Sequence, residues 1–266
     1  HTLSHRATEA YEGARDDIVK FINASNRHEV VFTSGTTEAV NLVAQSFCRP
    51  GLASGDKILL TKLEHHSNIV PWQLVCEQTG AELLIAPIDD SGQDDNNELV
   101  RQLHSGVKML AIAHVSNALG SINPVKDIVE KAHSLDIPVL LDGAQATPHM
   151  AVDVQDIDCD FYAFSGHKMF GPTGTGVLWG REALLEEMPP YKGGGDMILE
   201  VTFDTTVFNE LPYKFEAGTP NIAGTIGFGA AVDYLQSVGM QNICEHEKTL
   251  HDYMVSKLAT VDGVRL

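Results

Sequence analysis

The sequence predicts an α/β fold of the doubly wound kind, with a mostly parallel central sheet between two layers of helices. The first observation is that short apolar runs alternate with longer amphipathic segments along most of the chain. The second is that these short runs are continuously apolar, as expected for strands that are buried on both faces. Repeated units of a strand and a helix pack into such a sheet. The length of 266 residues allows one large domain, or one domain and part of another.

The strands and helices can be assigned in chain order from these patterns. The expected strands are Val30–Thr33, Lys57–Thr61, Ala81–Pro87, Met109–Val115, Pro138–Leu141, Phe161–Phe164 and Gly176–Trp179. The segments with helical periodicity are Ala7–Ile22, Thr37–Cys48, Ile69–Gln78, Asn97–His104 and Val125–Ser134. Because functional sites of such sheets lie at the carboxyl ends of the parallel strands, we expect the functional residues among the polar residues that follow these ends.

The last part of the chain has a different pattern. We expect a loop or hairpin at Gly193–Gly195 and Asp204–Asn209, followed by a turn at Phe215–Asn221. From Ile226 to Ala259 the pattern is mainly helical, with a break at Gly239.

Charge and composition argue against several classes of function. The chain has 18 basic and 36 acidic residues, and its formal charge of −18 would repel the phosphates of a nucleic acid. It contains no apolar run of about 18 residues, and its first residues have neither the basic nor the apolar region of a signal peptide. We therefore expect a cytoplasmic protein that binds neither nucleic acid nor membrane.

The four cysteines are Cys48, Cys76, Cys159 and Cys244. They lie far apart with no CxxC pair, which favours reduced thiols over disulfides or a zinc site. We expect all four to be buried or half-buried.

The stretch Phe161–Gly176 carries the strongest indication of chemistry. Here an apolar strand runs through Ser165 and His167 to Lys168 and then into a glycine-rich loop. Most lysines are exposed surface residues. An amine at the end of an apolar strand is partly removed from water, however, and this is the environment that a Schiff-base lysine needs.

Asp142 closes another apolar strand, Pro138–Leu141. Burying an aspartate is costly unless a positive group meets it. The protonated ring nitrogen of pyridoxal phosphate would be such a group. An ordinary turn aspartate is the alternative. A single expected strand, Phe161–Phe164, lies between Asp142 and Lys168 in the sequence, so the two residues can follow neighbouring strands and face one pocket.

Three further clusters follow strand ends. Thr33–Glu38 combines hydroxyl groups, a glycine and a helix start, which fits either an anion site or a plain helix cap. His65 and His66 are adjacent and lack a third ligand at a suitable spacing, so we expect no metal site there. An imidazole stacked on a flat cofactor ring fits His65 better. Asn117 could donate to a carboxylate, or be an ordinary turn residue.

Together these motifs resemble the SufS/CsdA-type (group II) cysteine desulfurases, within the class V aminotransferase branch of the fold-type I pyridoxal-phosphate enzymes. The resemblance covers essentially the whole chain. It runs through TSGTTEAVNLVA, LEHHSNIVPWQ, HVSNALG, LDGAQA, DFYAFSGHKMFGPTGTGVLWG, GGGDMI and FEAGTPN. SGHKMFGPTG together with EHHSNIVPW is its most specific part.

The resemblance implies a role for each matching residue. Lys168 would bind the cofactor covalently and shuttle protons. His65 would stack on the pyridine ring, and Asp142 would meet the ring nitrogen. Gln145 would lie near the phenolic oxygen, and Asn117 would help to hold the substrate carboxylate.

The resemblance also implies how the cofactor phosphate is held. Thr36 or Thr37 would form the cradle together with Ser165 and His167. Thr219 would reach the phosphate from the second subunit, because the family is homodimeric with active sites at the subunit interface.

The implied reaction converts L-cysteine to L-alanine and passes the sulfur to a cysteine as a persulfide, for delivery to an acceptor protein in iron–sulfur cluster assembly. The family's acceptor cysteine lies in an R-x-G-x-H-C segment, which this sequence lacks. We therefore expect residues 1–225 to form the cofactor-binding large domain. Residues 226–266 would be a helical connection to a small domain outside this sequence, and catalysis by this chain alone is not expected.

The residues leave other functions open. A selenocysteine lyase (acting on L-selenocysteine), a kynureninase or an aminotransferase of the same class would use the same lysine chemistry. A non-catalytic scaffold that binds pyridoxal phosphate would also explain the absence of the nucleophile.

Overall fold

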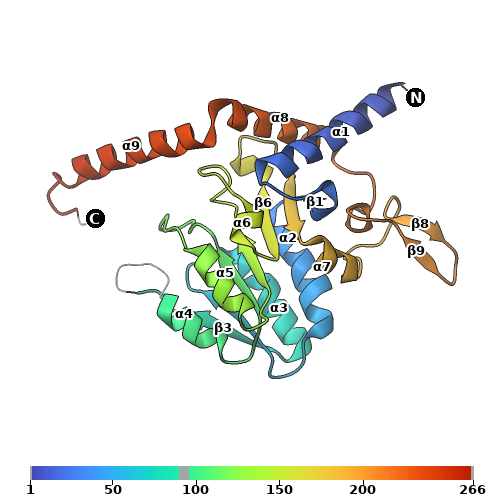
Figure 1. Cartoon of the computed structure of the whole chain (residues 1–266), viewed down its shortest axis with the longest axis horizontal. Helices are drawn as coiled ribbons and strands as arrows, with labels where there is room; N and C mark the ends of the chain where they lie inside the picture. Colours follow the sequence, from blue (N-terminus) through green and yellow to red (C-terminus); the bar gives the residue numbers. More distant parts are fainter. Residues whose placement is uncertain (1, 90–95, 265–266) are drawn as a thin grey trace.

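The computed structural model describes residues 2–89 and 96–264. Within them, seven strands form a central sheet of order β1-β7-β6-β5-β4-β2-β3 (Figure 1). The strands are β1 (Val30–Thr33), β2 (Lys57–Thr61), β3 (Glu82–Ala86), β4 (Val107–Ala113), β5 (Val139–Asp142), β6 (Phe161–Ser165) and β7 (Gly176–Gly180). β7 runs antiparallel to both of its neighbours, and the remaining pairs are parallel. The mostly parallel α/β fold predicted from the sequence is confirmed.

Helices cover both faces of this sheet. The α-helices of the described residues are α1 (Thr2–Phe21), α2 (Thr36–Leu42), α3 (Val70–Thr79), α4 (Asn96–Leu103), α5 (Val125–His133), α6 (Val154–Ile157), α7 (Glu182–Glu187), α8 (Ile222–Val238) and α9 (Met240–Leu258), of which α9 does not cover the sheet. α2 continues as a π-helical segment, Val43–Cys48. The first helix begins five residues before the predicted Ala7, in a stretch whose exposed side chains give no apolar stripe to detect.

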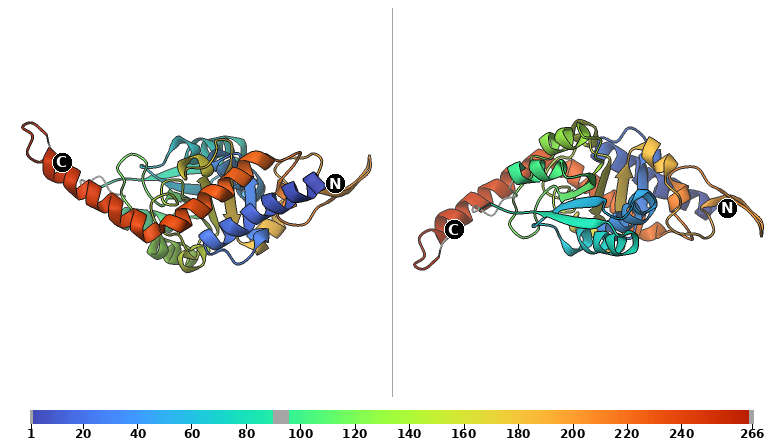
Figure 2. Two further views of the ribbon diagram at one scale, coloured as in Figure 1. Left: turned by 90° about the horizontal axis from the view of Figure 1, so that it is seen from above. Right: turned by 90° about the horizontal axis from the view of Figure 1, so that it is seen from below.

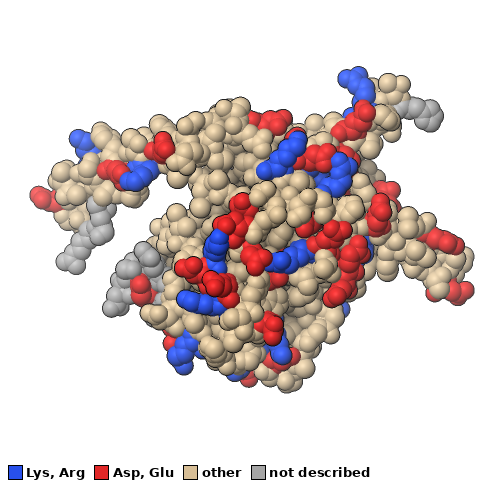
Figure 3. Space-filling model, in the orientation of Figure 1, with Lys and Arg blue, Asp and Glu red and all other residues tan. Residues whose placement is uncertain are grey.

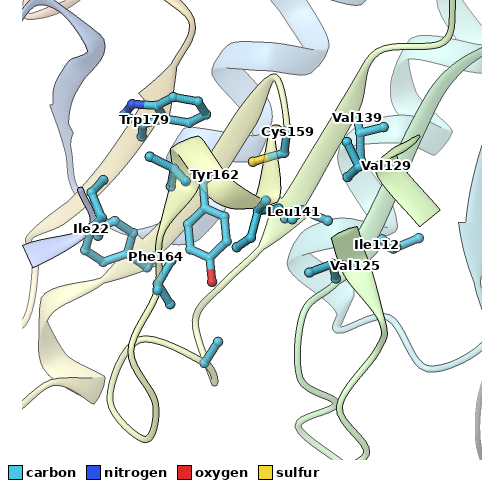
Figure 4. Close-up of a cluster of buried hydrophobic side chains, with 14 of the residues drawn as sticks. Ile22, Ile112, Val125, Val129, Val139, Leu141, Cys159, Tyr162, Phe164 and Trp179 are labelled. Carbon is cyan, nitrogen blue, oxygen red and sulfur yellow. The ribbon is translucent and has the colours of Figure 1, made fainter. Parts of the chain in front are cut away.

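The strands divide their side chains between two apolar clusters, one on each face. In β2, Leu59 belongs to the cluster that includes residues of α1, α4, α5 and α8, whereas its neighbours Ile58 and Leu60 belong to the cluster that includes residues of α2, α3 and α7. Figure 4 shows part of the first cluster, where Leu141 of β5 lies beside Tyr162 of β6. Because both faces are covered, the strands are apolar along their length, and this is why continuous runs rather than alternating ones mark them.

The region after β7 contains a hairpin and two long helices. Strands β8 (Ile198–Val201) and β9 (Thr206–Phe208) form the expected hairpin, which projects from the body (Figure 1). α8 packs beside α1, and the chain breaks at Gly239, as predicted, before α9 extends away from the sheet (Figure 2). The domain boundary at residue 225 stays a prediction. No helix within residues 2–89 and 96–264 is long and apolar enough to cross a membrane.

A buried ion pair ties α1 to the loop before α8. Arg15 is completely buried, and its Nη1 donates to Glu216 Oε1 and to the Val30 carbonyl, both at 2.7 Å. Its Nε also donates to Glu12 at 3.0 Å. The backbone N–H of Phe32 donates to Glu216 at 2.7 Å, and the guanidinium lies 4.3 Å from the centre of the Phe32 ring. One carboxylate therefore joins α1, β1 and the loop that carries Thr219.

We predict that Glu216→Ala lowers the free energy of unfolding by about 3 kcal/mol, because it leaves the Arg15 charge buried with only part of its partners. Denaturant unfolding followed by circular dichroism measures this loss. The matched control is Asp252→Ala, which removes the partner of Lys248 in an exposed pair on α9 and should change stability little. A loss in Glu216→Ala no larger than in this control would contradict the prediction.

Candidate active site

The carboxyl ends of five strands meet at one edge of the sheet. The parallel strands β2, β4, β5 and β6 end at Thr61, Ala113, Asp142 and Ser165. β1 runs in the same direction, because two antiparallel pairings through β7 separate it from β6, and it ends at Thr33. The polar residues singled out in the sequence follow these ends, so the topology gathers most of them at one place.

Lys168, His65 and Asp142 come together at this edge. Asp142 is 5% exposed at the end of β5, and Lys168 is half-buried in the 3₁₀ turn after β6. Burial raises the pKa of the Asp142 carboxyl, against the lowering effects of the Ala144 N–H and of the charges on Lys168 and His65. The Ala144 N–H donates to Asp142 Oδ1 at 3.0 Å. Asp142 is thus a turn residue and also a buried carboxyl that faces two cationic side chains.

Thr36 and Ser165 meet beside the start of α2. The backbone N–H of Thr36 donates to Ser165 Oγ at 2.8 Å, and the two hydroxyl oxygens are 2.7 Å apart. This approach needs glycine at two positions. A Cβ on Gly176 of β7 would lie 2.4 Å from the Cα of Gly35, whose φ of +153° also disfavours a side chain. The close packing brings the N-terminus of α2, a favourable place for an anion, against the end of β6.

Thr37 and His167 are exposed next to this pair, on α2 and in the turn that carries Lys168. Gln145 is half-buried, three residues after Asp142. Asn117 is exposed in the turn that follows β4.

His65 and Thr219 complete the set of predicted residues. His65 is exposed, and its Nδ1 accepts the Ser67 N–H at 3.2 Å and lies 2.7 Å from the Ser67 hydroxyl oxygen. Thr219 lines a hollow against Ala7 and Tyr11 of α1. Its neighbours Gly218 and Pro220 line a second hollow together with Thr33, the last residue of β1.

Glu64 is a buried carboxyl that the sequence analysis did not single out. Its carboxylate accepts hydrogen bonds from Thr61, Asn68 and the Ala113 N–H. Burial raises its pKa to about 8, and the nearby charge of Asp142 adds to this rise. The sequence pattern that marks Asp142, an acidic residue at or shortly after the end of an apolar strand, also marks Glu64. The adjacent histidines were considered for metal binding and for ring stacking, and Glu64 was not considered with them. In the described part of the chain no group of three or more His, Cys, Asp and Glu side chains is arranged to hold a metal ion.

His114 and Tyr162 support Asp142 from the core. The backbone N–H of His114 donates to the backbone carbonyl of Asp142 at 2.9 Å. The ring nitrogen Nδ1 of His114 lies 2.8 Å from the Tyr162 hydroxyl oxygen. A Cβ on Gly143 would lie 2.0 Å from the Tyr162 ring, so the turn after Asp142 packs directly on that ring. Burial lowers the pKa of His114 to about 4, so it is a neutral packing group.

Three cysteines are poorly suited to nucleophilic chemistry. Cys48, Cys76 and Cys159 are buried, and burial raises the pKa of each thiol, which disfavours the reactive thiolate. Cys244 is exposed on α9. The expectation that all four are buried is thus wrong for Cys244, because α9 buries none of its residues.

The residues at this edge fit pyridoxal phosphate. The Asp142 carboxyl is desolvated and would be stabilised by a cationic ring nitrogen. The start of α2 with Thr36 and Ser165 offers donors for a phosphate. Lys168 provides an amine directly after β6, and in the sheet order β6 lies between β1, which leads into α2, and β5, which ends at Asp142.

Comparisons with known proteins agree with this fit. The sequence pattern of class-V aminotransferases matches residues 1–266. A probable cysteine desulfurase of Halalkalibacterium halodurans is 50% identical over 264 residues, which are 99% of this chain and 65% of that protein. The crystal structure of the cysteine desulfurase CsdA from Escherichia coli matches with a TM-score of 0.92 and 41% identity, over 97% of this chain and 65% of that one.

A C-DES mutant with glycine covalently linked to its pyridoxal phosphate shares the fold, with a TM-score of 0.89 over 97% of this chain and 69% of that one. At 22% identity this likeness concerns the fold alone. The chain spans 65% of the length of the Halalkalibacterium relative and of CsdA, which is less than two thirds of each.

We predict that His114 makes stability depend on pH between about 6.5 and 4. The unfolded chain takes up a proton on this residue near pH 6.5, whereas the folded chain does so only near pH 4. The stabilising contribution is therefore present above pH 6.5 and is lost as pH falls, by at most about 3 kcal/mol. Urea unfolding of wild type and His114→Asn at several pH values measures it as a shrinking stability difference.

The matched control for this titration is His246→Asn, which changes an exposed histidine on α9. Its stability difference from wild type should stay constant over the same range. If the His114→Asn difference is equally constant, His114 does not titrate as described.

Proposed function

The chain belongs to the class V aminotransferase family, whose cofactor is pyridoxal phosphate, and we propose that the whole protein is a cysteine desulfurase. It would convert L-cysteine to L-alanine and pass the sulfur to a cysteine as a persulfide. The observation that supports this most is that Lys168, Asp142 and His65 come together at the carboxyl ends of the strands. The chain is also 50% identical to a probable cysteine desulfurase.

Each residue at the edge has a role in this proposal. When bound, the cofactor supplies an electron sink for the bonds of the substrate amino acid. Lys168 holds the cofactor through its amine and moves a proton at Nζ. Asp142 keeps its carboxylate opposite the ring nitrogen, and His65 covers the ring from its exposed loop. Gln145 lies toward the ring oxygen, and Asn117 holds the substrate carboxylate.

The phosphate has its own set of residues in the proposal. Thr36, Thr37, Ser165 and His167 bind it, with the backbone N–H groups of the first turn of α2 contributing. Their side chains surround a helix start where the close approach of Thr36 to Ser165 fixes the geometry.

We extend the proposal to a homodimer in the cytoplasm that delivers sulfur to an acceptor protein for iron–sulfur cluster assembly. Thr219 would then reach the phosphate of the partner subunit, as the family resemblance implies. The β8–β9 hairpin exposes Leu199, Val201 and Phe203, and a partner surface would cover them. The buried thiols Cys48, Cys76 and Cys159 are poorly suited to accept the persulfide, because burial disfavours the thiolate.

We predict that Lys168→Ala abolishes covalent attachment of the cofactor. The wild-type protein should show a visible absorption band that borohydride removes, with the added mass located on Lys168 by peptide mass spectrometry. The control is Lys62→Ala, which removes an exposed lysine directly after β2 at the same edge and should retain the band. Covalent labelling that persists in Lys168→Ala would overturn the assignment.

We also predict that the full-length protein forms alanine from L-cysteine and that persulfide collects on a cysteine. Amino-acid analysis and alkylation of the persulfide measure the two products. Reaction with L-selenocysteine alone, amino transfer to a keto acid, or binding of the cofactor without turnover would each contradict a cysteine desulfurase. These outcomes would point to a selenocysteine lyase, an aminotransferase or a scaffold, respectively.

A further inference from the structure

We propose that Glu64 is a positioning residue that holds the loop carrying His65 in place against the end of β4. The inference rests on the proposed function, in which His65 covers the cofactor ring. Glu64 is 7% exposed and both of its carboxyl oxygens accept hydrogen bonds from protein groups, so it would act through His65.

The Glu64 carboxylate joins two strand ends. Its Oε1 accepts hydrogen bonds from the Thr61 hydroxyl at 2.8 Å and from the Ala113 N–H at 3.0 Å. Its Oε2 accepts from Asn68 Nδ2 at 2.6 Å. Thr61 is the last residue of β2, and Ala113 is the last residue of β4. The loop after β2 is therefore attached to the neighbouring strand through a single side chain.

Two of the residues that donate to Glu64 lie on either side of His65 in the sequence. Thr61 precedes His65, and Asn68 follows it and donates its own backbone N–H to the His65 carbonyl at 2.7 Å. Asn68 is held in turn by the buried Trp72, whose Nε1 donates to Asn68 Oδ1 at 2.9 Å. Movement of the His65 backbone would therefore break hydrogen bonds that lie inside the core.

The arrangement of donors calls for an acceptor at each of the two oxygens of Glu64. Trp72 donates to the amide oxygen of Asn68, so the amide nitrogen must point at Glu64 Oε2. The Ala113 N–H points at Oε1, where a carboxyl proton can still face the Thr61 hydroxyl. Two N–H donors thus face two oxygens, one each. A glutamine at this position would set its amide group against at least one donor, and an unmatched buried polar group is costly.

The position of His65 can be measured directly in Glu64→Gln. Carbon-13 labelling of histidine rings gives a resonance for His65, assigned by its loss in His65→Gln, and it can be recorded with the cofactor removed. We expect Glu64→Gln to shift and broaden this resonance. The matched control, Glu77→Gln, neutralises an exposed glutamate on α3 and should leave it in place.

The rate of cofactor loss, followed as decay of the visible band, is the second readout. It should rise about tenfold in Glu64→Gln, as expected for one disrupted buried hydrogen bond. Thr61→Val removes one donor at nearly constant volume and should give a smaller rise, about threefold. If Glu64→Gln does not fold, the His65 resonance and the rate of cofactor loss are measured in Thr61→Val instead, and they test the same inference.

An unchanged His65 resonance with an unchanged release rate would overturn the inference. Failure of the proposed function looks different, because the wild-type protein would then lack the visible band or its label on Lys168. In that case the His65 resonance still decides whether Glu64 positions the loop.

Discussion

The burial of two carboxyl groups at the carboxyl edge of the sheet is the constraint on which the rest of the site depends. Asp142 and Glu64 each follow a strand that is apolar along its length, and burial raises the pKa of both. A buried carboxyl is stable only where donors or cations face it. Glu64 meets donors from its own loop and from β4, whereas Asp142 has Lys168 and His65 nearby. The hydrogen bonds of Glu64 hold the loop after β2 in place, whereas the surroundings of Asp142 would suit a cationic ligand.

The remaining architecture brings an anion site to the same edge. β7 is antiparallel, so its pairing with both β1 and β6 aligns the ends of those two strands. Glycine at 35 and 176 lets the start of α2 approach β6 closely enough for Thr36 to bond to Ser165. In the proposed function, a phosphate next to the helix start and a cationic ring near Asp142 would belong to one ligand.

Much of this could be predicted from the sequence, because both-face burial makes each strand a continuous apolar run and places the polar residues after it. Lys168 and Asp142 stand out for that reason. The contacts that determine Glu64 could not be predicted, since Ala113 lies 49 residues away and offers only its backbone. Likewise, Arg15 and Glu216 are separated by 201 residues and look like ordinary charges on the surface of a helix and a loop.

The formal charge of the molecule opposes the binding of an anionic ligand, but the charges close to the proposed phosphate site would dominate there. The chain carries a formal charge of −18, and Figure 3 shows acidic side chains spread over the face in view. Salt screens exposed charges beyond about 8 Å at physiological ionic strength. A phosphate at the start of α2 therefore responds mainly to the helix N-terminus and to the turn from His167 to Lys168, and only weakly to the distant surface. The acidic surface can favour solubility without weakening the site.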